Sequence, residues 1–340
     1  MPRIVRFAKH GGPEVLEVRD EPLEEPGEGE VRLKIDSFGL NRGEIMFRSG
    51  AYVASTRFPS RIGVEASGVI DALGPGVTNF AVGDRVATVP FLSWDEWGNW
   101  TPESSIKYGV YGESAVVPAY CLTHSPEGIS AVEAGAIWAQ YATAWGGLVD
   151  YAGVSSDDIV LVTAASSSAA LGGLQIAKNA GARVIAVTRK AEKADFLLAA
   201  GAEHVVVTEE EDLETRVKAI TGGQGFTIAY DPVGGAFVGD LVAAAQPCAT
   251  IVSYGNLRIE PIDIPILPML AKRLNLKFHS VFDTVRLPEK RAACLAFVRD
   301  QVACGALTPI VDKTFPLEQI VDAHRYMESN TQRGKIVVTT

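Results

Sequence analysis

Small and hydroxyl-bearing residues fill a short stretch between two apolar runs, and they are the residues best placed to do chemistry. Residues 159–162 form an apolar run typical of a buried strand, and a helical pattern begins near residue 168. The turn between them contains Ala165, Ser166, Ser167, Ser168 and Ala169. A tight turn from a strand into a helix N-terminus exposes unpaired backbone N–H groups and the positive end of the helix dipole. We therefore expect this turn to bind the diphosphate of a dinucleotide.

The glycine pattern of such turns, G-x-G-x-x-G, is absent from this chain. Its small positions correspond to Ala164, Ser167 and Ala170. Glycines serve the sharp turn, the close approach of the diphosphate and the packing of helix on strand. Ala and Ser can meet the last two needs at some cost, but they adopt positive φ less readily. A strand–helix–strand unit that binds no nucleotide stays open as the alternative.

The end of the next strand, after residues 184–187, indicates which dinucleotide would bind. A site that selects NAD has an Asp or Glu there for the ribose 2′-hydroxyl. This chain has Thr188, Arg189 and Lys193 in that region, a hydroxyl and two cations. Because Arg and Lys pair with phosphate, the sequence favours NADP(H) over NAD(H). A solvated, charged start of a helix is the alternative interpretation.

The elements that must position this turn follow an α/β pattern in two domains. Residues 126–285 alternate between helical and strand patterns, which predicts a Rossmann-type doubly wound parallel sheet. Residues 1–125 are rich in Gly, Pro and short β-type runs, and residues 286–340 show the same kind of pattern. We therefore expect a second, mostly β domain built from residues 1–125 and 286–340.

Composition points to a cytoplasmic globular enzyme. The chain has 340 residues, 47% of them hydrophobic, and a formal net charge of −10, which argues against a nucleic acid or an anionic membrane as the main partner. No apolar stretch approaches membrane-spanning length, and we see no signal-peptide core. The four cysteines are spaced neither as a disulfide framework nor as a zinc site.

An ordered set of short motifs makes the chain resemble the medium-chain dehydrogenase/reductases, and within them the zinc-free quinone oxidoreductases. The set spans nearly the full length and includes residues 39–44, 48–52, 63–70, 82–86, 112–115, 141–145, 200–202, 230–235 and 334–335. The resemblance implies a GroES-like catalytic domain made of both chain ends and an inserted Rossmann-type NADP-binding domain.

The same resemblance bears on the metal and the reaction. Asn41, Val64 and Ala139 stand where the similar zinc alcohol dehydrogenases have ligands, and these residues cannot form a catalytic zinc site. Without a metal, the expected reaction is hydride transfer to an electrophilic small-molecule acceptor, a quinone or an α,β-unsaturated carbonyl. Asn41 and Tyr52 are the candidate catalytic residues that contact this acceptor. A turn-capping Asn and a packing Tyr are the alternative interpretations.

Gly255 and Asn256 follow the strand pattern that ends at residue 254, at the carboxyl end of the sheet, where ligands bind in open α/β sheets, and we expect them to contact the cofactor. The resemblance implies Thr143 and Lys335 as further cofactor contacts; an ordinary helix near the domain junction and a solvated surface lysine are the alternative interpretations. Glu65 lies within an apolar run, and we expect it to have a structural hydrogen-bonding role rather than to act as the catalytic acid.

Two segments carry separate expectations. Trp94, Trp97 and Trp100 recur every three residues and indicate either a lid over a flat or hydrophobic acceptor or a surface loop that packs on its own domain or on a partner subunit. The apolar, Pro-rich stretch 259–270 favours a homodimer formed at a sheet edge. Two functions compete with the quinone or enone reductase: a 2-enoyl thioester reductase, and a non-catalytic member with a degraded nucleotide site.

Overall fold

The computed structural model describes residues 1–52, 54–90 and 103–340. These residues form two compact units, which we call the β unit (residues 1–139 and 311–340) and the parallel-sheet unit (residues 140–310). Both boundaries lie later in the chain than the predicted ones after residues 125 and 285. The reason is that α3 (Ala131–Ala134) packs on strands of the β unit, whereas α11 (Pro288–Ala303) packs on α10 (Val281–Arg286) of the parallel-sheet unit.

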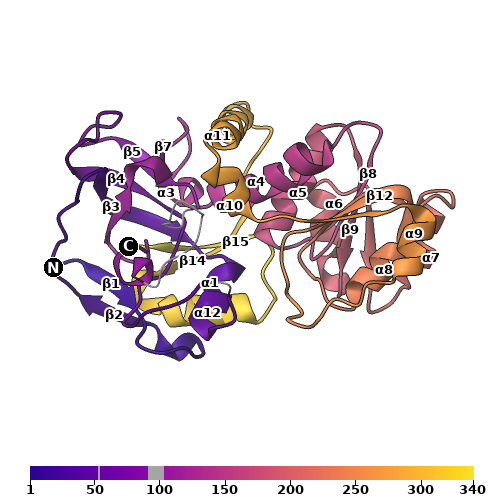
Figure 1. The fold of residues 1–340 in the computed structure, drawn as a ribbon, viewed down its shortest axis with the longest axis horizontal. Helices are drawn as coiled ribbons and strands as arrows, with labels where there is room; N and C mark the ends of the chain where they lie inside the picture. Colours follow the sequence, from indigo (N-terminus) through magenta and orange to yellow (C-terminus); the bar gives the residue numbers. More distant parts are fainter. Residues whose placement is uncertain (53, 91–102) are drawn as a thin grey trace. The chain divides into compact units, whose positions relative to one another are not determined.

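A seven-stranded sheet organises the β unit (Figure 1). The order is β14-β15-β3-β4-β5-β7, and β6 also pairs with β3. All its pairs are antiparallel except β14 with β15, and a two-stranded ribbon of β1 and β2 completes the strands. The strands are β1 Arg3–Arg6, β2 Glu17–Asp20, β3 Glu30–Gly39, β4 Ala66–Leu73, β5 Arg85–Thr88, β6 Ser114–Pro118, β7 Leu122–His124, β14 Val311–Pro316 and β15 Lys335–Thr339.

Short helices close the β unit around one apolar core. That core joins strand residues such as Leu33, Ile35 and Val338 to residues of α12, including Ala323 and Met327. The helices are η1 Pro13–Val15, α1 Arg42–Ser49, α2 Ser104–Lys107, η2 Ala119–Cys121, α3, η5 Leu317–Gln319 and α12 Ile320–Glu328.

Six parallel strands form the sheet of the other unit, in the order β10-β9-β8-β11-β12-β13. This is the strand order 3-2-1-4-5-6 of doubly wound nucleotide-binding sheets, so the chain changes direction across the sheet between β8 and β11. The strands are β8 Ile159–Val162, β9 Arg183–Thr188, β10 His204–Val207, β11 Phe226–Asp231, β12 Ala245–Ser253 and β13 Asn275–Phe278. The predicted doubly wound sheet and the mostly β second domain are both confirmed.

Helices cover both faces of this sheet. A right-handed crossover that runs one way along the sheet places its helix on one face, and a crossover that runs the other way places its helix on the opposite face. The helices α7, α8 and α9 lie together in one layer (Figure 1). The helices are α4 Trp138–Ala144, which contains the unit boundary, η3 Trp145–Ala152, α5 Ser168–Asn179, η4 Ala191–Lys193, α6 Ala194–Ala199, α7 Leu213–Ile220, α8 Phe237–Ala244, α9 Ile266–Lys272, α10 and α11. No helix in the described part of the chain is long and apolar enough to cross a membrane.

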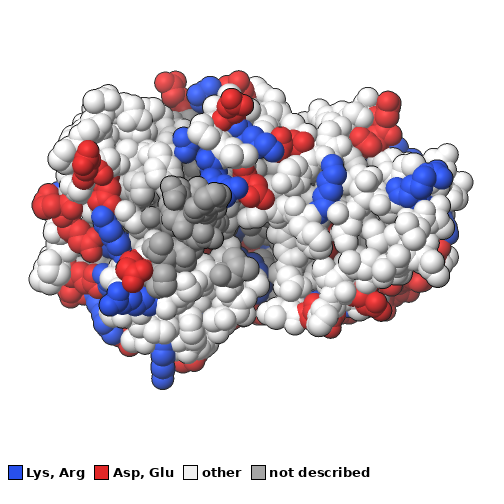
Figure 2. Space-filling view, viewed as in Figure 1, with Lys and Arg blue, Asp and Glu red and all other residues white. Residues whose placement is uncertain are grey.

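The β13 edge of the parallel sheet exposes large apolar side chains. On α9, Ile266, Leu267 and Leu270 are 63%, 78% and 66% exposed, and Phe278 at the end of β13 is 61% exposed. The face drawn in Figure 2 has few charged side chains around α8 and α9. An exposed strand edge beside an apolar helix is typical of a surface that pairs with another chain.

Candidate functional site

The turn after β8 is fastened to the strands on both sides of it. The Thr163 N–H donates to the Tyr230 carbonyl of β11 at 3.1 Å, and the Ala165 N–H donates to the Val187 carbonyl of β9 at 3.1 Å. Between them Ala164 has φ of +44°, the left-handed conformation that favours glycine. The turn therefore includes one residue in a conformation that glycine usually adopts, although it contains no glycine.

The turn leads directly into the N-terminus of α5. Ser167 is the N-cap, with extended φ and ψ of −76° and 154°, and its side chain does not cap the helix. Ser168 and Ala169 occupy the first helical positions, whose N–H groups have no acceptor within the helix. The first turn of α5 contains no acidic residue. This end of α5 therefore presents free N–H groups and positive potential, as an anion site requires.

Lys193 links the end of β9 to this turn. Its side chain is buried, with 8% exposure, and its Nζ donates to the Ser166 Oγ at 2.9 Å. Thr188 is also buried at the end of β9, whereas Arg189 is exposed. The structure thus brings Ser166 and Lys193 together and leaves Arg189 on the surface.

The end of β12 carries the next predicted contacts. Gly255 and Asn256 follow Tyr254, and a Cβ added at Gly255 would lie 3.1 Å from Pro232. The Asn256 Oδ1 is buried and has no hydrogen-bond partner among the described residues. The Tyr254 hydroxyl oxygen is likewise buried and unpartnered among those residues. A dinucleotide would use such unsatisfied polar atoms at the carboxyl edge of the sheet, so these residues fit it.

Thr143 lies in α4, where its carbonyl oxygen is 3.1 Å from the His279 Nε2. Burial lowers the pKa of His279 to about 4, so this imidazole is neutral near pH 7 and its Nε2 donates to the carbonyl. The Thr143 backbone is therefore held by a residue that follows β13.

A buried ion pair holds the Asn41 side chain in the β unit. The Lys335 Nζ donates to the Glu65 Oε2 at 2.5 Å and to the Asn41 Oδ1 at 2.7 Å. The side chains of Lys335 and Glu65 have no exposed area. Glu65 also accepts from the Ala139 N–H at 2.8 Å. Asn41 is therefore tied to a fully desolvated lysine and glutamate.

A second buried carboxylate lies beside this pair. Glu44 accepts from the Asn41 N–H at 2.6 Å, from the Tyr111 hydroxyl at 2.5 Å and from the Val64 N–H at 3.0 Å. Burial raises the pKa of Glu44 to about 6. Burial, together with the charge of Glu44, raises the pKa of Tyr52 to about 12, so the Tyr52 phenol keeps its proton.

The predicted residues thus fall into two groups, one in each unit. Asn41, Tyr52 and Lys335 lie in the β unit, where Asn41 is the N-cap of α1 and a Cβ at Gly43 would lie 3.8 Å from the Tyr52 hydroxyl. The other predicted residues belong to the parallel-sheet unit. Lys335 was predicted to contact the cofactor; the structure gives its ammonium Asn41 and Glu65 as partners, and the cofactor contact stays a prediction. Trp94, Trp97 and Trp100 lie outside the described residues.

Sequence reasoning missed Glu44, Tyr111 and Tyr254. Glu44 had a detectable signal, because an Asn followed by a Glu three residues later is a capping-box pattern. Tyr111 and Tyr254 had none, since their contacts join segments far apart in the sequence.

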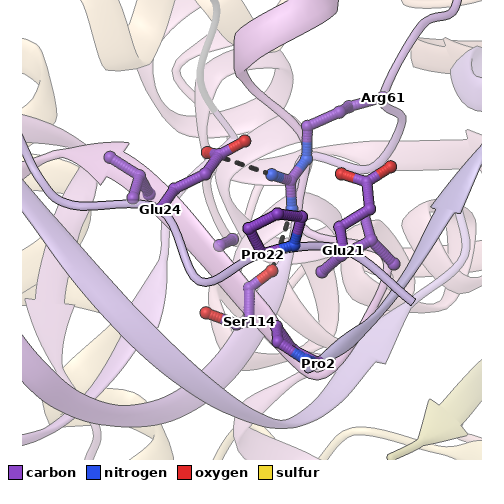
Figure 3. A pocket seen from close by; sticks show the side chains of 9 residues that line it. Pro2, Glu21, Pro22, Glu24, Arg61 and Ser114 are labelled. Atoms are coloured by element: carbon purple, nitrogen blue, oxygen red, sulfur yellow. Dashed lines mark hydrogen bonds and ion pairs between the residues drawn. The ribbon is translucent and has the colours of Figure 1, made fainter. Parts of the chain in front are cut away.

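A small cavity beside Arg61 is a separate feature of the β unit. Figure 3 shows the Arg61 guanidinium pointing toward Ser114 and Glu24, with contacts of 2.8 Å to the Ser114 carbonyl and 3.4 Å to the Glu24 carboxylate. Arg61 Nε has no partner among the described residues. The cavity has room for about one water molecule, which would satisfy that N–H. A cavity of this size is too small for a substrate.

The described residues contain no group of three His, Cys, Asp or Glu side chains that could hold a metal ion. Of the three positions considered for zinc, Val64 and Ala139 offer only backbone atoms. The oxygen of the third, Asn41, accepts from Lys335. The donor set therefore does not fit catalytic zinc.

Two family models match the chain. Residues 27–127 match the alcohol dehydrogenase GroES-like domain, and residues 200–338 match a zinc-binding dehydrogenase domain.

Full-length relatives extend this similarity. A quinone oxidoreductase of Pseudomonas aeruginosa is 30% identical over 345 residues, covering 99% of each chain. The structure is also similar to that of an NAD-dependent alcohol dehydrogenase, with a TM-score of 0.88, 33% identity and 99% of each chain covered. The Escherichia coli quinone oxidoreductase complexed with NADPH gives a TM-score of 0.89 at 27% identity, over 99% of this chain and 100% of that one.

Proposed function

Because the chain belongs to the medium-chain dehydrogenase/reductase superfamily, in its quinone oxidoreductase-like branch, we propose that it is an NADPH-dependent, metal-independent reductase of quinones or α,β-unsaturated carbonyls. The observation that carries the proposal is the buried Lys193 ammonium, 2.9 Å from the hydroxyl of Ser166 at the turn into α5. A cation held at a turn of this kind favours a cofactor that carries an additional phosphate.

The end of β9 supports NADPH over NADH, although one structural neighbour is described as NAD-dependent. Thr188 and Arg189 end the strand where an NAD site has an acidic residue. An acid at that position would repel a 2′-phosphate, whereas Arg189 is exposed and able to pair with one. These residues belong to this chain itself, so we give them more weight than the cofactor in the description of a structural neighbour that is 33% identical.

The β unit supports a reaction without a metal. Zinc would need ligands at positions where this chain has Val64, Ala139 and an Asn41 oxygen already bonded to Lys335. The Lys335 ammonium is itself a buried cation, 2.5 Å from the Glu65 carboxylate, and it would repel a metal ion placed beside it.

Asn41 and Tyr52 supply the polar groups that the reaction requires of the protein. The chemistry supplied by bound NADPH is transfer of a hydride to the electrophilic carbon of the acceptor. The negative charge then develops on the acceptor's conjugated oxygen, where an N–H of Asn41 stabilises it by hydrogen bonding. Tyr52 keeps its proton near neutral pH and donates it to that oxygen.

Cofactor titration tests the proposal. Quenching of tryptophan fluorescence measures the dissociation constants of NADPH and NADH for the wild type, Arg189→Ala and Lys193→Ala. We expect NADPH to bind at least about tenfold more tightly than NADH, a difference of about 1.4 kcal/mol. Arg189→Ala should weaken NADPH binding and change NADH binding less than twofold, whereas Lys193→Ala should weaken NADPH binding more than NADH binding. Lys178→Ala, at the opposite end of α5, is the matched lysine control and should bind both cofactors as the wild type does.

Oxidation of NADPH by p-benzoquinone and by 2-cyclohexenone, before and after treatment with EDTA, then tests the reaction. Turnover that EDTA leaves unchanged supports the proposal. No saturable binding of either cofactor, or equal affinity for both, would overturn it.

A further inference from the structure

We propose that the hydroxyl of Tyr254 is a ligand of the cofactor diphosphate, acting with Ser167 and the N-terminus of α5; this inference rests on the proposed function. Tyr254 was not among the residues expected from the sequence. It stands directly after β12, at the carboxyl edge of the parallel sheet.

Backbone hydrogen bonds place Tyr254 and the turn on opposite sides of one strand end. The Tyr254 N–H donates to the Asp231 carbonyl at 2.9 Å, and the Thr163 N–H donates to the neighbouring Tyr230 carbonyl at 3.1 Å. Both acceptors lie at the end of β11. Tyr254 is therefore about two strand spacings, roughly 9.5 Å, from the start of the turn.

The ring of Tyr254 extends across that strand on the face that carries α5. It stacks on the ring of Tyr230, with centroids 3.9 Å apart and planes 18° from parallel. Tyr230 in turn lies against α5 and η3, because a Cβ added at Gly173 or Gly147 would be 2.7 or 2.9 Å from its ring. The stacking thus directs the Tyr254 hydroxyl from β12 toward the N-terminus of α5.

The Tyr254 hydroxyl has no close hydrogen-bond partner at this position. Its oxygen is buried and forms no hydrogen bond of normal length and angle with any described residue; its near polar neighbour, the Ser167 side chain, interacts with it only weakly. Burial, together with the charge of Asp231, raises the pKa of Tyr254 well above its usual value, and the nearby Ser167 side chain offsets part of this effect. A buried hydroxyl without a partner is unfavourable, so a protonated donor in this place is suited to a ligand oxygen.

The absence of glycine from the turn after β8 explains why a side-chain hydroxyl would be needed there. In a glycine-rich turn the backbone approaches the diphosphate directly, but a Cβ on Ser167 keeps the phosphate farther from the main chain. Ser167 does not use its hydroxyl to cap α5, and Lys193 adds positive charge at Ser166. Side-chain hydroxyls of Ser167 and Tyr254 then donate the hydrogen bonds that the backbone would otherwise provide.

A matched pair of tyrosine variants tests the inference. Tyr254→Phe and Tyr230→Phe each remove one buried, unpartnered hydroxyl from the same stacked pair, but only the first hydroxyl is directed at the turn. The probes are NADPH, 2′-phospho-ADP-ribose, which retains the diphosphate without nicotinamide, and 2′,5′-ADP, which lacks the diphosphate bridge. Isothermal titration calorimetry gives each dissociation constant, and thermal unfolding of the unliganded proteins gives their stability.

We expect Tyr254→Phe to weaken NADPH and 2′-phospho-ADP-ribose five- to tenfold and to leave 2′,5′-ADP within twofold. Tyr230→Phe should leave all three within twofold, and neither variant should lower the unfolding temperature of the unliganded protein. Unchanged 2′-phospho-ADP-ribose binding in Tyr254→Phe would overturn the inference while leaving the proposed function intact. A lowered unfolding temperature confined to that variant would also overturn it, since it would indicate a structural bond to Ser167. If the wild type binds none of the probes, the proposed function itself fails.

Discussion

The ammonium of Lys335 lies 2.7 Å from the amide oxygen of Asn41, and this contact fixes the direction of the amide. An ammonium group only donates, so the amide oxygen must face Lys335 and the NH₂ group must face away. The NH₂ group has only long contacts: 3.3 Å to the Gly39 carbonyl, 3.4 Å to Glu65 and 3.5 Å to Glu44. It therefore stays available as a donor to a stronger acceptor.

Removing the Lys335 charge should destabilise the fold. Lys335→Met leaves the fully buried Glu65 carboxylate without its cation, which typically costs about 3–5 kcal/mol of unfolding free energy. Urea unfolding measures the loss. The double variant Lys335→Met with Glu65→Leu removes both charges and should recover at least half of it. A loss below about 1 kcal/mol in the single variant would contradict the importance of this pair.

Asn41→Asp separates the donor role of Asn41 from its structural role. Aspartate can still accept from Lys335, but it has no N–H to offer to the acceptor oxygen. We expect kcat for quinone reduction to fall about tenfold or more, as for the loss of an oxyanion donor. The NADPH dissociation constant, measured by fluorescence, should stay within twofold. Retention of wild-type kcat would show that Asn41 is only a helix cap.

Local patterns in the sequence predicted the fold because each strand and helix has a pattern of apolar residues that lies within its own segment. The apolar run at residues 159–162 is β8, and the run at 184–187 is the centre of β9, since four or more buried apolar residues bounded by turns suit a parallel strand. The unit boundaries could not be predicted from such patterns. Whether α3 and α11 belong to one unit or the other depends on the surfaces they pack against.

The contacts at the candidate sites also divide into those that local sequence patterns could predict and those that they could not. Ser166 and Lys193 were each predicted to contact the cofactor, from a turn and a strand end that lie close in sequence, and the structure places their side chains in contact with each other. The partners of Lys335 are 270 and 294 residues away, so no spacing rule could connect them. The left-handed Ala164 also could not be predicted, because alanine avoids that conformation unless its neighbours impose it.

Ala164→Gly should stabilise the protein. The left-handed conformation costs alanine roughly 1–2 kcal/mol, and part of that gain is offset by the greater freedom of glycine in the unfolded chain. We expect a net gain of about 0.5–1 kcal/mol in urea unfolding. Ala170→Gly, inside α5 at another position of the absent glycine pattern, should instead cost about 1 kcal/mol. Equal effects of the two variants would argue against strain at Ala164.

Glu44 should make stability depend on pH in a defined direction. Its pKa in the folded protein is about 6, raised by burial from 4.5, so the folded state binds a proton more tightly than the unfolded state. Its contribution is fully present below pH 4.5 and is lost as pH rises through 6, a change of about 2 kcal/mol. Glu44→Gln lacks this titration. The difference in unfolding free energy between wild type and variant should therefore shift against the wild type between pH 4.5 and 7.5. A difference that does not vary with pH would contradict the raised pKa.

The exposed edge formed by α9 and β13 leads us to expect a homodimer in solution. Leu267 and Leu270 are 78% and 66% exposed on α9, which packs on β12, and β13 is the edge strand of the same sheet; a second copy related by a two-fold axis would cover both. Sedimentation equilibrium should give twice the mass of the chain. Leu267→Glu with Leu270→Glu places two charges in that interface and should give a monomer. Leu198→Glu, at another exposed leucine (46%) on α6, is the control and should remain dimeric. A monomeric wild type, or a double variant that stays dimeric, would show that this edge is not the interface.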